Sequence, residues 1–131
     1  MIQVGTILKV SDKTGVSLVK CIKVLGQSKK RIAYIGDVIV VSVQFINSKK
    51  IQKLKWNKRK RFLKGTLHRG LIIRSKVNYN RLNNIFIKFN ENAVVLVNKK
   101  IVPISNRVYG PVLTELCRKW PSLGCVTRYM I

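Results

Sequence analysis

The sequence predicts a mainly β fold, a small barrel or sandwich closed by one short C-terminal helix. Short stretches rich in Val and Ile recur along most of the chain, and turn signals separate them at intervals of roughly ten residues. Near the C-terminus the apolar period changes from that of a strand to that of a helix. A closed barrel would also leave no long exposed sheet edge. At 131 residues we expect a single domain, 1–131.

The first two expected strands are Thr6–Val10 and Leu18–Leu25. The first alternates between apolar and polar side chains, which predicts one buried face. In the second, Lys20 and Lys23 fall on opposite faces of a regular strand. A β-bulge or burial on both faces near Cys21-Ile22 would explain that pattern.

The next two expected strands are Val38–Ile46 and Leu71–Val77. Alternation in the first predicts that Phe45 shares a buried face with the preceding valines. In the second, Arg74 and Lys76 fall opposite the buried face, and we expect them on the outer wall of the barrel.

Two further strands are expected at Ile85–Phe89 and Ala93–Val97, with Ile85, Ile87 and Phe89 pointing inward. The polar turn Asn90-Glu91-Asn92 joins them.

The last expected element is a helix that starts at about Pro111, which suits a first helical turn, and stops at Pro121. Apolar residues recur at the i, i+3, i+4 spacing: Val112, Leu113, Leu116, Cys117 and Trp120. The expected layout is thus a barrel over about 1–110 and a helix with a tail over about 111–131.

Charge is the strongest indication of function. The chain has 27 Lys and Arg against four Asp and Glu, a formal net charge of +23, and is still 47% hydrophobic. Such self-repulsion destabilises a compact state unless a polyanion neutralises it. The apolar content argues against a disordered basic tail. A folded core under a strongly basic surface indicates nucleic-acid binding.

The basic residues are densest in Asn47–Arg69, which contains no acid. We expect this segment to be a basic arm, a long protruding hairpin or loop that neutralises phosphates and releases counterions. Within it, Trp56 would either stack on an unpaired base or anchor the hairpin to the barrel.

Catalytic, metal and cofactor sites are not indicated. The four acids are scattered, the single His68 has no acidic partner nearby in the sequence, and there is no phosphate-cradling glycine motif. Three cysteines without a CxxC pair favour neither a zinc site nor a disulfide framework. We therefore expect no enzyme activity, no metal and no cofactor.

DNA and membrane partners are not indicated either. The sequence lacks helix-turn-helix spacing and a basic helix leading into heptads, so double-stranded DNA is disfavoured. No apolar run approaches the roughly 20 residues of a membrane span.

Several blocks resemble the large-subunit ribosomal protein number fourteen family, in its bacterial type. They occur in the family's order over most of the chain: Met1-Ile2-Gln3, Val10-Ser11-Asp12-Lys13-Thr14-Gly15, Cys21-Ile22-Lys23-Val24-Leu25-Gly26, Gly36-Asp37-Val38-Ile39, Ile72-Ile73-Arg74-Ser75-Lys76, Ile87 to Leu96 and Pro103 to Val112. The resemblance implies a five-stranded β-barrel with a protruding β-ribbon and a small C-terminal helical part. Glu91 stands where the family has a glycine in the turn after Phe89, so the resemblance also implies a positive φ at Asn90 or Asn92, which Asn tolerates.

The resemblance also implies function and partners. It implies a structural protein of the large ribosomal subunit that binds large-subunit rRNA and forms part of an intersubunit bridge, opposite small-subunit rRNA. The implied protein neighbours are large-subunit ribosomal proteins three and nineteen, and a silencing factor docks on some members. The alternative that the residues leave open is a free RNA-binding chaperone or regulator with the same barrel.

The residues expected to contact RNA form three groups. They are Lys49, Lys50, Lys53, Lys55, Lys58, Arg59, Lys60, Arg61, Lys64 and Arg69 in the arm, Lys29, Lys30 and Arg31 as a second contact, and Arg74 and Lys76 on the barrel wall. Arg107 and Tyr109 are expected to face a protein neighbour or the small subunit.

The expected location is a mitochondrion. Ile, Lys and Asn are abundant, while Ala occurs at two positions, which is the codon bias of an AT-rich genome. No presequence is evident in the first ten residues, so we expect the protein to work in the compartment where it is made. A plastid or the cytoplasm of an AT-rich bacterium is the alternative.

Overall fold

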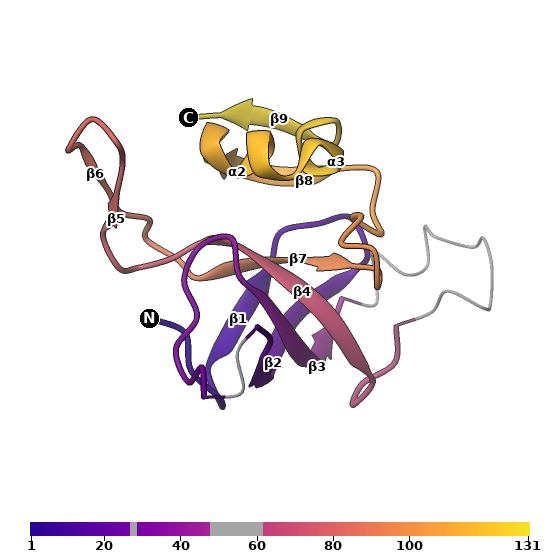
Figure 1. Ribbon diagram of the computed structural model, residues 1–131. Coiled ribbons are helices and arrows are strands. Elements are labelled where there is room, and N and C mark those ends of the chain that lie inside the picture. The colour runs from indigo at the N-terminus through magenta and orange to yellow at the C-terminus, as the bar shows by residue number, and fades with distance from the viewer. Residues whose placement is uncertain (27–28, 48–61) are drawn as a thin grey trace.

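The computed structural model describes residues 1–26, 29–47 and 62–131. Five strands form a closed barrel in the order β1-β2-β3-β4-β7 (Figure 1). Their bounds are β1 Ile7–Val10, β2 Val16–Val24, β3 Val38–Ile46, β4 Leu67–Arg74 and β7 Ala93–Val97. Neighbouring strands are antiparallel except β1 and β7, which close the barrel in parallel. The predicted mainly β barrel is confirmed.

The predicted irregularity in the second strand is a register shift between Cys21 and Lys23 in the β2–β3 ladder. It lets Cys21 lie fully inside the barrel while Ile22 and Lys23 are both exposed. Burial raises the pKa of the Cys21 thiol, so this side chain behaves as a small apolar residue.

Strands β4 and β7 are buried on both faces. Ile72 and Val94 point into the barrel, whereas Leu71 and Val95 belong to a second apolar cluster on the outside of the barrel. Two-sided burial explains why β7 reads as an uninterrupted apolar run rather than an alternating one.

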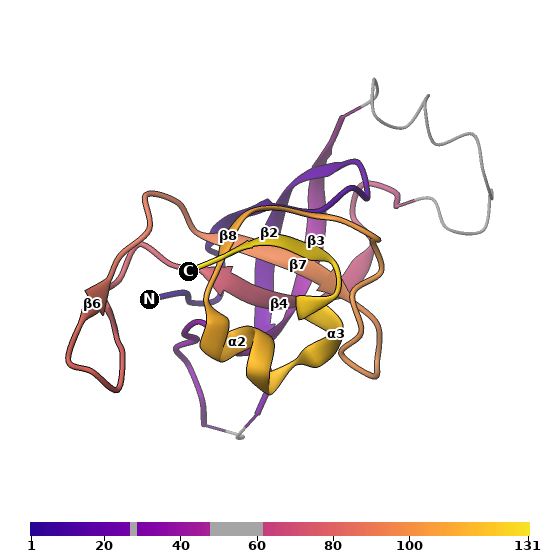
Figure 2. The ribbon, with the colours of Figure 1, turned by 90° about the horizontal axis from the view of Figure 1, so that it is seen from above.

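A C-terminal layer covers that outer face (Figure 2). It consists of β8 Val108–Val112, α2 Thr114–Lys119, α3 Pro121–Gly124 and β9 Thr127–Met130, with β8 and β9 paired in parallel. The predicted short helix is present, but its start differs from the prediction. Pro111 lies in β8, and α2 begins three residues later, because the backbone of Val112 bonds to Ile131 in the β8–β9 pair. Pro121 follows the end of α2 and opens α3.

Between β4 and β7 the chain leaves the barrel as a small hairpin, β5 Tyr79–Asn80 and β6 Phe86–Ile87 (Figure 1). The expected barrel strand Ile85–Phe89 is therefore wrong. Ile85 is 56% exposed, and Phe89 alone of its three predicted inward residues is fully buried.

Two further expectations are corrected. Positive φ occurs at Asn84 in the hairpin turn and at Ile101, not at Asn90 or Asn92. Phe45 is 61% exposed rather than buried. It pairs with Leu18 of β2, and register shifts on both sides of that pair interrupt the alternation that would otherwise place Phe45 inside the barrel.

Candidate nucleic-acid interface

The four acidic side chains of the sequence all lie in the described residues, and each has a partner within the fold. Asp12 is buried and accepts hydrogen bonds from the backbone N–H of Thr14 at 2.9 Å and of Leu96 at 3.0 Å. Asp37 forms an ion pair with Lys30, with 2.8 Å between Oδ1 and Nζ. Both aspartates therefore stabilise turns next to the barrel.

The two glutamates are held in ion pairs. Glu91 lies 2.9 Å from the Nζ of Lys9 and 3.0 Å from the Nη2 of Arg74. The hydrogen bond from Lys9 and the charge of Arg74 hold the pKa of Glu91 below its usual value, against the opposing effect of burial. Glu115 lies 2.8 Å from the Nε of Arg81. With every acid engaged in this way, the described Lys and Arg far outnumber the carboxylates that could balance them.

One end of the barrel gathers several of these unbalanced cations. We call it the basic end: β1, β3 and β7 finish there, and β2 and β4 begin there. Its exposed side chains come from three connections and from the first part of β4. They are Lys13, Lys64, Arg69, Lys99, Lys100 and Arg107.

Backbone contacts join the connections at the basic end. The N–H of Lys13 donates to the carbonyl of Arg107 at 3.2 Å and to the hydroxyl of Ser105 at 3.0 Å. The guanidinium of Arg69 donates to the carbonyl of Lys99 at 3.2 Å. The cations thus stand on connections that are held to one another.

Sequence reasoning named Lys64, Arg69 and Arg107 but missed Lys13, Lys99 and Lys100. These three lysines could have been found from the positions of their turns. The Asp12–Gly15 turn and the Asn98–Ile101 turn both lie at the end of the barrel where β3 ends and β4 begins. The predicted arm residues Lys49, Lys50, Lys53, Lys55, Lys58, Arg59, Lys60 and Arg61, with Trp56, lie outside the described residues. The arm remains a prediction.

A second basic group lies at the opposite end of the barrel, between β2 and β3. Lys29 and Arg31 are exposed there, next to the Lys30–Asp37 pair and to Tyr34, which is half exposed. These side chains line a cleft of about 640 Å³. The exposed Lys76 also lies at this end, just after β4.

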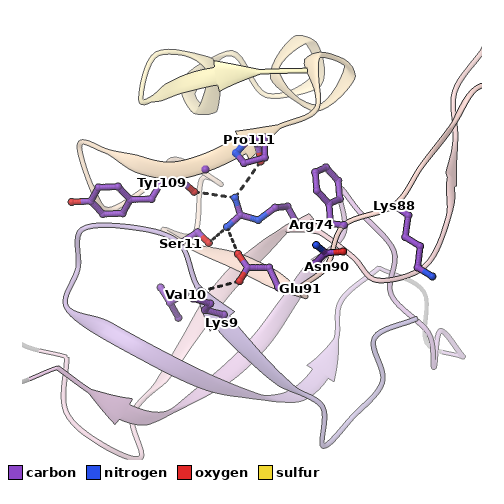
Figure 3. Close-up of a pocket in the computed structure, with 11 residues that line it drawn as sticks. Lys9, Val10, Ser11, Arg74, Lys88, Asn90, Glu91, Tyr109 and Pro111 are labelled. Carbon is purple, nitrogen blue, oxygen red and sulfur yellow. Dashed lines mark hydrogen bonds and ion pairs between the residues drawn. The ribbon is translucent and has the colours of Figure 1, made fainter.

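Arg74 does not lie on the barrel wall. Its side chain is 4% exposed, and its guanidinium donates to the carbonyls of Tyr109 at 3.0 Å and Pro111 at 3.3 Å (Figure 3). It also bonds to the hydroxyl of Ser11 and pairs with Glu91. Burial lowers the pKa of Arg74 while Glu91 opposes the shift. These contacts join the barrel to β8, and they occupy the guanidinium with protein acceptors.

The cavity around Arg74, about 560 Å³, is bounded by the first strand, the 88–91 turn and β8 (Figure 3). Tyr109, predicted to face a partner, lines its rim and is 44% exposed. Arg107, also exposed, lies two residues earlier, where the connection from the basic end enters β8. The contact predicted for this pair remains a prediction.

The described residues offer little for other chemistry. His68 packs edge-on against Phe62, with 4.7 Å between ring centroids, and its Nε2 lies 2.9 Å from the hydroxyl of Thr66. Burial lowers its pKa. Within ranges 1–26, 29–47 and 62–131, no three His, Cys, Asp or Glu side chains gather to hold a metal ion. In the same ranges no helix is long and apolar enough to span a membrane.

A comparison with protein families gives one match over the whole chain. The family model of ribosomal protein L14p/L23e matches residues 1–131. The match agrees with the sequence blocks quoted above and with the closed five-stranded barrel. The chain therefore belongs to the ribosomal protein L14p/L23e family, and it is a structural protein of the large ribosomal subunit.

Proposed function

We propose that this protein binds large-subunit rRNA through the basic end of the barrel. The observation that carries the proposal is the charge balance: the four acids are all engaged in local contacts, while exposed Lys and Arg accumulate on adjoining connections. In a ribosomal protein, folded RNA is the polyanion that neutralises such a surface.

The binding is electrostatic and shape-based. The side chains that would contact large-subunit rRNA phosphates and fix the position of the barrel, without reading base sequence, are those of the basic end other than Arg107: Lys13, Lys64, Arg69, Lys99 and Lys100. The bonds that join the Lys13, Arg69 and Lys99 connections support this role, because groups that are already held in place lose less conformational entropy on binding. The predicted arm would extend the same surface.

The opposite end supplies a second proposed contact. Lys29, Arg31 and Lys76 would meet phosphates there, and Tyr34 offers an exposed ring beside them for an unpaired base. Lys30 would act mainly by holding this connection through its ion pair with Asp37.

The remaining proposals concern assembly. Arg107 and Tyr109 would face a neighbouring ribosomal protein or small-subunit rRNA, making the protein part of the intersubunit interface. Large-subunit proteins three and nineteen are the proposed neighbours. The proposed location is the mitochondrial ribosome, which the AT-rich codon bias supports.

Salt-dependent binding of the purified chain to large-subunit rRNA tests the proposal. Each lost phosphate contact lowers the log–log salt slope by about 0.7 to 0.9. The magnitude of this slope should therefore be smaller by between one and two for the variant Lys99→Gln/Lys100→Gln than for the parent chain. Lys20→Gln/Lys23→Gln, which removes the same charge from the β2 wall, should change it much less. Equal effects of the two variants would contradict a localised surface.

Sedimentation of native extract tests the assembly. The chain should migrate with large subunits and whole ribosomes at about one copy each and leave them at high salt. Migration at the top of the gradient at physiological salt would instead favour a free RNA-binding chaperone or regulator.

A further inference from the structure

The tip of the β5–β6 hairpin is an exposed apolar surface on a strongly basic protein. Leu82 is 99% exposed, Phe86 65% and Ile85 56%. We call these three residues the apolar tip. Figures 1 and 2 show the hairpin projecting away from the barrel and from the C-terminal layer. Large apolar side chains that gather on a projection usually mark a binding surface.

The apolar tip is also free of unbalanced charge. From Asn80 to Ile87 the single cation is Arg81, and it is paired with Glu115. A surface that contacts RNA phosphates needs cations, and aliphatic side chains such as Leu82 and Ile85 cannot stack on bases as aromatic rings do. Depletion of charge with aromatic and apolar enrichment is instead the composition of a protein–protein interface core.

The hairpin is fixed to the C-terminal layer both at its base and beside its turn. At the base, Tyr79 and Ile87 are paired across the two strands and pack on the second apolar cluster. At the turn, Arg81 bonds to Glu115 in α2 and to the carbonyl of Ile131. A fixed hairpin presents the apolar tip in one orientation, which lowers the entropy that a partner must remove on binding.

The hairpin also stands at a suitable place. It connects the end of β4 to the start of β7, so it emerges at the barrel end opposite the basic end. A partner on the apolar tip would not compete with RNA bound at the basic end, and it would lie beside the second proposed RNA contact at Lys29, Arg31 and Lys76.

We propose that the apolar tip docks into an apolar recess of a different protein in the same ribosomal particle, with Phe86 and Leu82 as its anchors. In placing the partner within that particle, the inference rests on the proposed function. It goes beyond that function by assigning this protein contact to a surface outside the Arg107 and Tyr109 region.

Site-specific photocross-linking in assembled large subunits tests the proposal. The full chain carries a benzoylphenylalanine in place of Leu82, or in place of Leu67, which is 62% exposed at the basic end. At position 82 we expect an adduct with one other protein, sensitive to protease and resistant to ribonuclease. At position 67 we expect an adduct with rRNA.

The other outcomes at position 82 overturn the inference. An rRNA adduct, an adduct between two copies of this chain, or no adduct while the chain is present in the particle would each do so. If the chain is absent from large subunits, the proposed function fails as well, and the gradient used to prepare the particles reveals this separately.

A pair of variants checks the energetic role of the anchors. Leu82→Ser/Phe86→Ser should lower the occupancy of the cross-linked protein in the particles by about tenfold, as expected for loss of interface anchors. Val4→Ser/Ile7→Ser removes two apolar side chains away from the basic end, 63% and 60% exposed, and should leave that occupancy unchanged. Unchanged occupancy in the first variant would contradict the anchoring role.

Discussion

Among single residues, Arg74 joins the two parts of the structure most directly. Its guanidinium reaches from β4 to Ser11 at the end of β1, to Glu91, and to two carbonyls of β8. A buried charge is costly unless it is paired and hydrogen-bonded, and here several partners meet that requirement. Arg74 therefore fixes how the C-terminal layer sits on the barrel.

Gly110 makes that arrangement possible. Its φ is +81°, and a Cβ there would lie 2.2 Å from the Nη1 of Arg74. We predict that Gly110→Ala lowers the free energy of unfolding by about 1–3 kcal/mol more than Gly5→Ala, because it also disrupts the bonds of a buried charge. Gly5 is the matched control, with a φ of +90° and no atom within 4 Å of its Cβ position. Urea unfolding measures both, and equal losses would mean that backbone strain alone matters.

Glu91 gives a prediction for pH. Its pKa in the folded protein is lowered, first by the hydrogen bond from Lys9 and also by the charge of Arg74. A lowered folded pKa adds stability above the unfolded value, usually 4.5, and that stability is lost as the pH falls through the folded pKa. The free energy of unfolding should therefore decrease below pH 4.5, and Glu91→Gln should make this decrease smaller. Lys9→Met removes the hydrogen bond that most lowers the pKa of Glu91, so the stability that Glu91 contributes should be lost at a higher pH than in the parent chain. If Glu91→Gln leaves the decrease of the free energy of unfolding below pH 4.5 unchanged, the contacts of Glu91 with Lys9 and Arg74 do not contribute to it.

Among the elements, the β5–β6 hairpin is joined to α2 by the ion pair of Arg81 with Glu115. Arg81→Met should speed amide exchange at positions 81 and 84, whose N–H groups bond to the carbonyls of residues 85 and 81 across the turn. The increase should reach at most about fivefold, since a partly exposed ion pair contributes up to about 1 kcal/mol. Arg128→Met, an exposed position in β9, is the control. Equal exchange in both variants would show that packing of Tyr79 and Ile87 holds the hairpin without Arg81.

The elements also show how far the sequence can predict this structure. Alternation predicted β3 with its observed bounds and located the bulge at Cys21. It succeeded there because the order of apolar and polar residues in these strands follows which side chains are buried. It failed for Phe45, where register shifts in the β2–β3 ladder interrupt the alternation, and for Ile85, where the chain leaves the barrel. Local periodicity carries no information on either event.

The candidate interface was predictable to a similar degree. Composition indicated an RNA-binding surface, but Lys13 and Lys99 join it through the barrel topology, which brings distant turns to one end. For the same reason Arg74 could not be recognised as buried. Strand periodicity groups it with Ile72, on the face predicted to be the outer wall, but Ile72 points into the barrel. A register shift separates Ile72 from Arg74, whose side chain bonds to β8.

In the molecule as a whole, electrostatics opposes folding unless ions or RNA are present. The ion pairs of Lys9, Lys30, Arg74 and Arg81 are stabilising contacts that salt would weaken. Repulsion among the remaining cations is destabilising, and salt would weaken that as well. With a net charge of +23 the repulsion should dominate.

We therefore predict that the melting temperature of the purified chain rises as the salt concentration increases through the range where the Debye length shrinks below about 10 Å. Lys99→Gln/Lys100→Gln should melt higher than the parent chain at low salt, because it removes two charges from the crowded basic end. That difference should vanish at high salt, where repulsion is screened in both proteins. Thermal unfolding followed by circular dichroism measures these temperatures. A melting temperature that falls with salt would mean that the attractive contacts of the four acids stabilise the fold by more than the repulsion among the remaining cations destabilises it.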